Sequence, residues 1–248
     1  MPAHQLYLFS LGELEYPDPV KGAPGRVPVC GYLIRTTRGR HILVDTGAPE
    51  ALTGAASAEP WRPEIRARIG PDNDLLLQLE KLGLRPKDID LLIVSHFDFE
   101  HCGRNQVFAE ANVPMVVQRA HYEHALALPE RYDRSLFETN GRGYELVDGD
   151  TEIERGLALL ETSGHAIGHQ SVYVDTANGP VLLAIDAIEW PLIAQTREFP
   201  DWTEDPDAAD ASIDKLMHFA LDYRTYMIFG HDPGQWHSLT HAPRAFSR

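Results

Sequence analysis

The chain has 248 residues, of which 43% are hydrophobic and 24% are charged, and its formal net charge is −15. This is ordinary globular composition, and the length suffices for one domain with a large buried core. The negative charge argues against nucleic acid and anionic membrane surfaces as partners, because both would repel it. With no repeat or interdomain linker in view, we expect a single domain over residues 1–248.

Two features of the chain bear on its compartment. Cys30 and Cys102 are the only cysteines, so the sequence has neither a disulfide framework nor a multi-cysteine zinc motif. The N-terminus lacks the basic start and apolar core of a signal peptide, and no apolar run approaches the length of a membrane span. We therefore expect a cytoplasmic protein.

Strand-like runs predominate in two blocks along the chain, and helical patterns fall between or after them. This order favours two sheets packed face to face with helices outside, although periodicity alone does not distinguish this arrangement from another mixed α/β fold. Residues 48–70, rich in Ala, Pro and Gly, are interpreted as a loop with short helical pieces. The expected strands are 6–11, 29–36, 41–45, 90–95, 114–118, several short ones over 144–185, and 226–229. Three helices are expected: one that is capped by Asp72 or Asn73, one over residues 120–128 and one over residues 207–221.

Several candidate metal ligands each follow an apolar, strand-like run. A sheet that presents ligands at its strand ends can fix the geometry of a metal site. Imidazole and carboxylate bind zinc, iron or manganese, and two neighbouring ions can share a hydroxide. Together these residues predict a dinuclear site, whereas each alone would be read as a hydrogen-bonded histidine or a surface acid. The candidates are His96, Asp98, Glu100, His101, His165, Asp186 and His231.

Other histidines and one cysteine are given structural interpretations. The pairs His121 and His124, and His237 and His241, lie at helical spacing on polar stretches, which is typical of a solvated face. We expect Cys102 to pack behind the site as a small buried residue. We expect His169 to be structural, and Asp45 to orient one of the ligand imidazoles by a hydrogen bond.

The motifs resemble those of the metallo-β-lactamase-fold hydrolases, and most closely those of the N-acyl-homoserine lactone lactonase branch. The family motif is His-x-His-x-Asp-His followed by a distant His, Asp and His. The corresponding segments are SHFDFEHCGRN (95–105), TSGHAIGHQS (162–171), AIDA (184–187) and FGHD (229–232). The resemblance covers residues 6–232 and implies an α+β fold, a four-layer αββα sandwich with the metals at one edge.

The resemblance also implies a division of the ligands between two metals. One metal would be held by His96, Asp98 and His165, the other by Glu100, His101 and His231, with Asp186 as the bridge. Asp98 stands where the family has His, and Glu100 stands where it has Asp. Zinc is the expected metal, but the added carboxylate oxygen moves preference towards iron or manganese.

The segment after Asp186 is expected to shape the substrate pocket. The lactonases have a Tyr three residues after the bridging Asp, and here Glu189 takes that place, which bears on the choice of lactone. A Glu donates a hydrogen bond only when protonated, which requires a raised pKa. Of the aromatic residues Trp190, Phe199 and Trp202 that follow, at least one is expected to wall an apolar cleft. Residues 48–70, including Trp61, compete for the opposite wall.

The leading hypothesis is a metal-dependent hydrolase that opens an N-acyl-homoserine lactone or related cyclic ester with a metal-bridging hydroxide. Asp186, Glu100 and Glu189 are the catalytic candidates, two divalent ions are the cofactors, and the partner is a small lactone or ester. Two alternatives remain open. One is a diiron redox enzyme of this fold, although no flavin domain follows His231. The other is a non-catalytic ligand-binding protein. The sequence leaves the oligomeric state open, a homodimer included.

Overall fold

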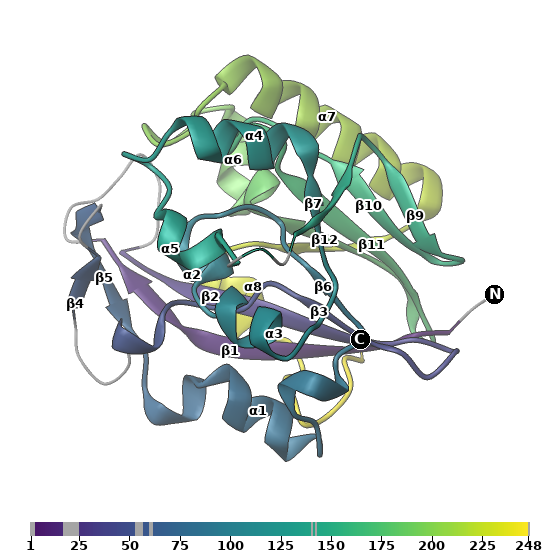
Figure 1. Ribbon diagram of the computed structural model, residues 1–248. Helices are drawn as coiled ribbons and strands as arrows, with labels where there is room; N and C mark the ends of the chain where they lie inside the picture. The colour runs from purple at the N-terminus through teal and green to yellow at the C-terminus, as the bar shows by residue number, and fades with distance from the viewer. Residues whose placement is uncertain are drawn as a thin grey trace.

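Two β-sheets lie face to face, and helices cover their outer surfaces (Figure 1). The computed structural model describes residues 3–16, 25–52, 57–59, 62–139, 141 and 143–247. The first sheet has the order β4-β5-β1-β2-β3-β6-β7-β8 and the second β13-β12-β11-β10-β9. The strands of the first sheet are β1 (Gln5–Glu15), β2 (Arg26–Arg35), β3 (His41–Val44), β4 (Ser57–Glu59), β5 (Arg62–Arg68), β6 (Leu91–Ile93), β7 (Met115–Gln118) and β8 (Glu145–Val147). Those of the second are β9 (Thr151–Glu154), β10 (Leu157–Glu161), β11 (Gln170–Thr176), β12 (Gly179–Ile185) and β13 (Tyr226–Phe229).

The helices lie outside these sheets, with α1 and α7 on opposite faces of the molecule (Figure 1). The α-helices are α1 (Leu75–Lys81), α2 (Phe99–Cys102), α3 (Asn105–Glu110), α4 (Arg119–Ala127), α5 (Arg134–Phe137), α6 (Pro191–Thr196), α7 (Pro206–Tyr223) and α8 (Pro233–Trp236). Short 3-10 helices span Glu50–Leu52, Pro71–Asn73, Pro86–Asp88 and Asp186–Ile188. The four layers are therefore those that the resemblance implied.

Strand β1 shows how the sequence builds two cores at once. Successive side chains of a strand point to opposite faces of its sheet. Leu6 and Leu8 accordingly join the core between the two sheets, while Tyr7 and Phe9 join the core beneath the helices that cover the first sheet. A strand buried on both faces needs continuous rather than alternating apolar sequence. The same holds for β2, whose residues are buried along almost its full length.

Helix ends follow the local sequence. The Asp74 carboxylate accepts hydrogen bonds from the backbone N–H groups of Leu76 and Leu77, so α1 begins after Asp74 rather than at the predicted Asp72 or Asn73. The longest helix, α7, begins with Asp205 accepting from the N–H of Ala208 and with Pro206 in its first turn. Both patterns satisfy N–H groups that have no partner within the helix.

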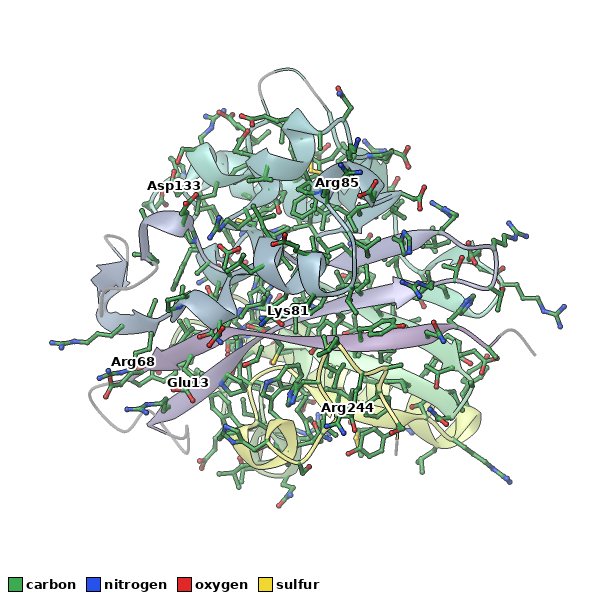
Figure 2. The ribbon with its side chains drawn as sticks, turned by 90° about the horizontal axis from the view of Figure 1, so that it is seen from below. Glu13, Arg68, Lys81, Arg85, Asp133 and Arg244 are labelled. Carbon is green, nitrogen blue, oxygen red and sulfur yellow. The ribbon has the colours of Figure 1, made fainter. Side chains whose placement is uncertain are left out.

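Several elements differ from the sequence-based expectation. Residues 57–59 and 62–68, predicted as part of a loop with short helical pieces, form β4 and β5. Strand β5 pairs with β1 in a register that places Glu13 opposite Arg68. Figure 2 shows these two side chains close together at the edge of the molecule. The Pro-rich segment after Trp190 contains α6, which starts at a Pro in its first turn and is too short to show helical periodicity. Among the described residues, no helix is long and apolar enough to cross a membrane.

Candidate metal centre

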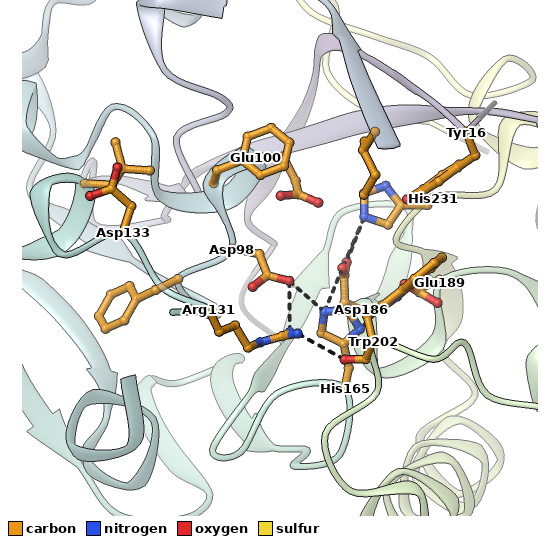
Figure 3. Close-up of a pocket in the computed structure, with 14 residues that line it drawn as sticks. Tyr16, Asp98, Glu100, Arg131, Asp133, His165, Asp186, Glu189, Trp202 and His231 are labelled. Atoms are coloured by element: carbon orange, nitrogen blue, oxygen red, sulfur yellow. Dashed lines mark hydrogen bonds and ion pairs between the residues drawn. The ribbon is translucent and has the colours of Figure 1, made fainter. Parts of the chain in front are cut away.

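The candidate ligands come from four separate strand ends and meet in one place. Figure 3 shows those that line a cavity: Asp98, Glu100, His165, Asp186 and His231. The loop after β6 carries His96 and Asp98 and leads into α2, which carries Glu100 and His101. His165 follows β10, Asp186 directly follows β12, and His231 follows β13. The expectation that these residues lie just beyond strands is confirmed, and the structure brings all seven together.

The Asp186 carboxylate lies at the centre of the group. Its Oδ1 is 3.4 Å from His101 Nε2 and 3.1 Å from His231 Nε2. Its Oδ2 is 3.5 Å from His165 Nε2 and 3.8 Å from His96 Nε2, and it also lies 3.2 Å from His231 Nε2. One carboxylate thus faces imidazole nitrogens on two sides.

Among the described residues, the donor atoms form four overlapping groups of three, and the two that include Asp186 join it to His96 and His101 and to His165 and Glu189. His96, Asp98 and His165 bring their donor atoms within 4.8 Å of one another, and Glu100, His101 and His231 do the same. These are the two sets that the resemblance implied. His165 Nε2 lies 3.3 Å from Asp98 Oδ2, so the aspartate oxygen points into its group.

The electrostatics of the centre favour a bound cation. Among the described residues, several buried atoms that could coordinate a metal have no hydrogen-bond partner: His96 Nε2, His101 Nε2, Glu100 Oε2 and Asp186 Oδ1. Burial lowers the pKa of His231, but the Asp186 carboxylate outweighs it and raises the pKa to about 9. A buried anion that draws protons onto its neighbours is a site where a metal ion can take the place of those protons. The residues present therefore fit a pair of divalent ions.

Three of the ligand imidazoles are oriented through their other ring nitrogen. His101 Nδ1 lies 2.9 Å from Asp45 Oδ2, as predicted, and His231 Nδ1 lies 2.7 Å from the carbonyl oxygen of Pro28. His96 Nδ1 lies 3.0 Å from the Ser95 hydroxyl, which itself donates to Asp45. Asp45 adopts a left-handed backbone conformation with φ of 59° to reach both partners. Such contacts set the tautomer and the direction of a metal-binding ring.

His121 is the clearest error of the sequence analysis. Its side chain is completely buried, whereas helical spacing predicted a solvated face. Its Nε2 accepts a hydrogen bond from the N–H of Phe97, and its Nδ1 lies 2.8 Å from the carbonyl oxygen of Ile167. His121 therefore ties the first ligand loop to the loop that carries His165. The sequence gives no sign of this, because α4 is covered by loops distant along the chain.

Two other structural interpretations hold. Cys102 is buried, and its thiol donates to the carbonyl oxygen of Phe97. His169 is buried as well, and its Nε2 accepts a hydrogen bond from the N–H of Asp186. Both residues support the ligand loops from behind.

A cavity enclosing about 520 Å³, part of it open to solvent, lies directly over the ligands. Trp202 lines it, and its ring stacks on Tyr16 at 5.4 Å with an interplanar angle of 7°. Ile65 of β5 also lines it, so the segment 48–70 contributes to a wall, while Trp61 lies outside the described residues.

The other two predicted wall residues lie elsewhere. Phe199 lines a smaller neighbouring hollow of about 220 Å³, which shares His165 and Asp186 with the main cavity. Trp190 is only 3% exposed and packs with Ile213 and Leu216 of α7, so its predicted place in the wall is wrong. Trp190 directly precedes α6, and the turn there directs its ring into the core beneath α7.

Glu189 is buried beside the centre, with one carboxylate oxygen engaged by two neighbours. Its Oε1 accepts a hydrogen bond from Trp202 Nε1 at 2.9 Å and lies 3.5 Å from His165 Nδ1. Burial raises the pKa of Glu189 to about 7, although His165 opposes the shift. Glu189 thus contacts the ring nitrogen of His165 that points away from Asp186.

Sequence reasoning missed Arg131 and Tyr16 altogether. Arg131 stands between α4 and α5, and its guanidinium contacts Asp98 at the edge of the cavity (Figure 3). Tyr16 directly follows β1, and its ring stacks on that of Trp202. Neither residue belongs to a motif, so no signal in the sequence could have found them.

The sequence and the fold both match characterised metalloenzymes. The protein-family model of the metallo-beta-lactamase superfamily matches residues 24–231 of the sequence. The chain belongs to this superfamily. It is 35% identical over 210 residues to an N-acyl homoserine lactonase of Bacillus sp, covering 83% of this chain and 82% of that protein. It is 28% identical to the N-acyl homoserine lactonase AttM of Rhizobium radiobacter over 91% of this chain and 90% of that protein.

A solved structure gives the same result. An N-acyl homoserine lactone hydrolase with the product N-hexanoyl-L-homoserine at its catalytic metal centre superposes with a TM-score of 0.87. The alignment covers 99% of this chain and 100% of that one, at 30% identity. These relatives are hydrolases of one superfamily, so the comparisons favour hydrolysis over the redox and ligand-binding alternatives.

Proposed function

We propose that this chain hydrolyses the ester bond of an N-acyl homoserine lactone or a closely related lactone, using two divalent metal ions. The observation that carries the proposal is the pair of three-residue groups, both of which contact Asp186, on the floor of a cavity. The lactonase relatives, one of which binds a ring-opened product at its metal centre, support the choice of substrate. A net charge of −15 supports a small molecule rather than nucleic acid as the partner.

His96, Asp98 and His165 would hold one ion, and Glu100, His101 and His231 the other. Asp186 would serve both, since its two oxygens face ligands of both groups. Divalent ions bound there would supply Lewis acidity and a nucleophile at neutral pH by lowering the pKa of water. Zinc is the leading candidate, and the oxygen donors Asp98 and Glu100 support iron or manganese as the alternatives.

The chain's own groups would then position the reactants. Asp45, the Pro28 carbonyl oxygen and the Ser95 hydroxyl lie against the outer nitrogens of the ligand rings and hold their inner nitrogens towards the cavity. We propose that Glu189 acts on His165 through its charge rather than through a hydrogen bond, because its Oε1 lies 3.5 Å from Nδ1 of that ring and this nitrogen has no hydrogen-bond partner among the described residues. Glu189 would thus assist catalysis through a ligand rather than at the lactone carbonyl.

The acyl chain would lie along the cavity wall. The stacked rings of Trp202 and Tyr16 present an apolar surface next to the ligands, and Ile65, Phe99 and Leu136 line the same cavity. An apolar cleft with a few polar groups at one end is suited to a molecule with a hydrocarbon tail and a polar ring. The tail contributes affinity, and the polar end places the ester bond at the metals.

The test combines metal analysis with a substrate panel. Protein purified without chelator is expected to contain about two metal ions per chain, since seven donors are too many for one tetrahedral ion. It should open N-hexanoyl and N-decanoyl homoserine lactone, with the acid detected by mass spectrometry. Asp186→Asn should lose metal and turnover, whereas Asp72→Asn, on a fully exposed side chain, should change neither. A protein loaded with two ions that opens no lactone in the panel contradicts the proposal.

A further inference from the structure

Among the described residues, Arg131 is the only Lys or Arg that lines the cavity. Its side chain is 15% exposed, and its guanidinium makes three contacts, one at each nitrogen. Nη2 donates to Asp98 Oδ2 at 3.2 Å, Nη1 donates to the Trp202 carbonyl oxygen at 3.1 Å, and Nε lies 3.0 Å from Glu204 Oε1. Figure 3 shows the guanidinium turned towards Asp98 and Trp202.

The contact with Asp98 falls on the oxygen that faces the histidines. Asp98 Oδ2 lies 3.3 Å from His165 Nε2 and 3.7 Å from His96 Nε2, as well as 3.2 Å from Arg131. A single carboxylate oxygen thus joins the ligand group to a fixed positive charge. The cavity otherwise concentrates negative charge, because its lining includes five acids: Asp98, Glu100, Asp133, Asp186 and Glu189.

Glu204 holds the guanidinium in place from the other side. Its Oε1 also accepts a hydrogen bond from the Tyr132 hydroxyl, and its Oε2 accepts one from the N–H of Ile167 in the loop that carries His165. The position of Arg131 is therefore set by contacts outside the ligand group. Since protein groups contact all three nitrogens of the guanidinium, Arg131 is placed to act on its neighbours rather than on a substrate.

We propose that Arg131 is a positioning residue of the metal centre, which holds the Asp98 carboxylate against His96 and His165 and offsets its charge. This inference rests on the proposed role of Asp98 as a ligand. An anionic ligand at position 98, where the family motif has a neutral His, adds one negative charge to the centre. A planar fork with several donors can serve three acceptors at once, which the single ammonium of Lys cannot. Removing it would leave the carboxylates of Asp98 and Glu204 buried without their common partner.

The first experiment measures zinc affinity by competition with a chromophoric chelator. Arg131→Met should weaken one of the two zinc sites at least tenfold, because the Asp98 oxygen is no longer held in place. Arg131→Lys, which keeps the charge but loses the fork, should give a smaller loss. Arg134→Met is the matched control, since that side chain is exposed and pairs with Glu138, the residue that directly follows α5. Its zinc affinities should stay within twofold of wild type.

The second experiment tests the pairing with Asp98 itself. In Asp98→His, the guanidinium would face a neutral ring and a bound cation, so zinc affinity should fall. In the double variant Asp98→His/Arg131→Met, affinity should rise above that of Asp98→His, although Arg131→Met alone lowers it. This reversal of sign is the signature of a partner to Asp98, and a residue that merely fills space would not produce it.

The proposal is overturned if Arg131→Met and Arg131→Lys both bind zinc within twofold of wild type. It is also overturned if the two substitutions act additively. If Arg131→Met does not fold, Arg131→Gln, which also removes the charge but keeps polar atoms, takes its place in both experiments and decides by the same comparisons. Lactone turnover by the wild-type protein decides the proposed function separately, because zinc affinity is measured without substrate.

Discussion

His121 offers the sharpest test of how the ligand loops are held. We expect His121→Phe to destabilise the protein strongly, although the residue is neither a proposed ligand nor part of the cavity lining. The substitution keeps a ring against Phe97 and Tyr132 but removes both ring nitrogens. The N–H of Phe97 and the carbonyl oxygen of Ile167 then lose partners that lie 2.8 Å away.

The magnitude follows from those two backbone groups. Leaving one buried polar group unsatisfied costs about 1–3 kcal/mol, so the loss should be about 2–6 kcal/mol in all. That loss is a large part of the free energy of unfolding of a typical protein, which is about 5–15 kcal/mol. His124→Phe is the control on the same helix. It removes one contact of the Glu204 carboxylate, which keeps Arg131, the Tyr132 hydroxyl and the N–H of Ile167, so it should cost only about 1 kcal/mol.

The effect should depend on pH in a defined direction. Burial lowers the pKa of His121 to about 4 from its ordinary value of 6.5, and Nε2 can accept from Phe97 only when the ring is neutral. The unfolded chain therefore binds more protons between pH 4 and 6.5, and the contribution of His121 is complete above pH 6.5 and lost as pH falls towards 4. The stability difference between wild type and His121→Phe should narrow by about 2 kcal/mol from pH 7.5 to pH 5.

Urea unfolding of the metal-free protein at both pH values measures these differences. Metal-free protein is required because metal binding is itself pH-dependent. The reasoning is refuted if His121→Phe costs no more than His124→Phe, or if its cost is the same at pH 7.5 and pH 5.

Three further predictions concern the centre and the cavity. Asp98→Ala should reduce the metal content from about two ions per chain towards one and lower turnover with it; full metal and full turnover would exclude Asp98 as a ligand. Trp202→Ala should raise KM for long-chain lactones about tenfold, because about two methylenes of the acyl chain, at about 0.8 kcal/mol each, lose their contact with the wall. Trp202→Phe keeps a ring beside Tyr16, so its KM should stay within about twofold of wild type. If Trp202→Ala and wild type have equal KM values, Trp202 belongs to the scaffold. Removing metal with a chelator should lower the melting temperature, and adding zinc should restore it. Ions that bind only the folded state stabilise it by about 2.7 kcal/mol per site when their free concentration is about 100 times Kd. An unchanged melting temperature would contradict a metal site.

Local sequence was sufficient to predict most strands and the place of the ligands. The runs before His96 and Asp186 are apolar because β6 and most of β12 are buried, and a strand buried on both faces can be recognised from a continuous apolar run. In β13, before His231, Ile228 is buried and the other three residues are partly buried. The order of histidines and acids then predicted two metal groups, which the structure assembles. The strand β5 was missed because its pairing with β1 is made between segments distant in the chain.

Tertiary structure alone decided which side chains surround the ligands. His121 and His124 occupy similar helical sequence, yet one is buried between two loops and the other is partly exposed. Trp190 and Trp202 belong to one aromatic segment, yet the first faces the core beneath α7 and the second faces the cavity. Arg131 meets Asp98 only because α4 and the loop before α7 pack beside the same strand ends. The period of a helix or strand determines which face is apolar, whereas the residue that meets a given side chain depends on how distant segments pack.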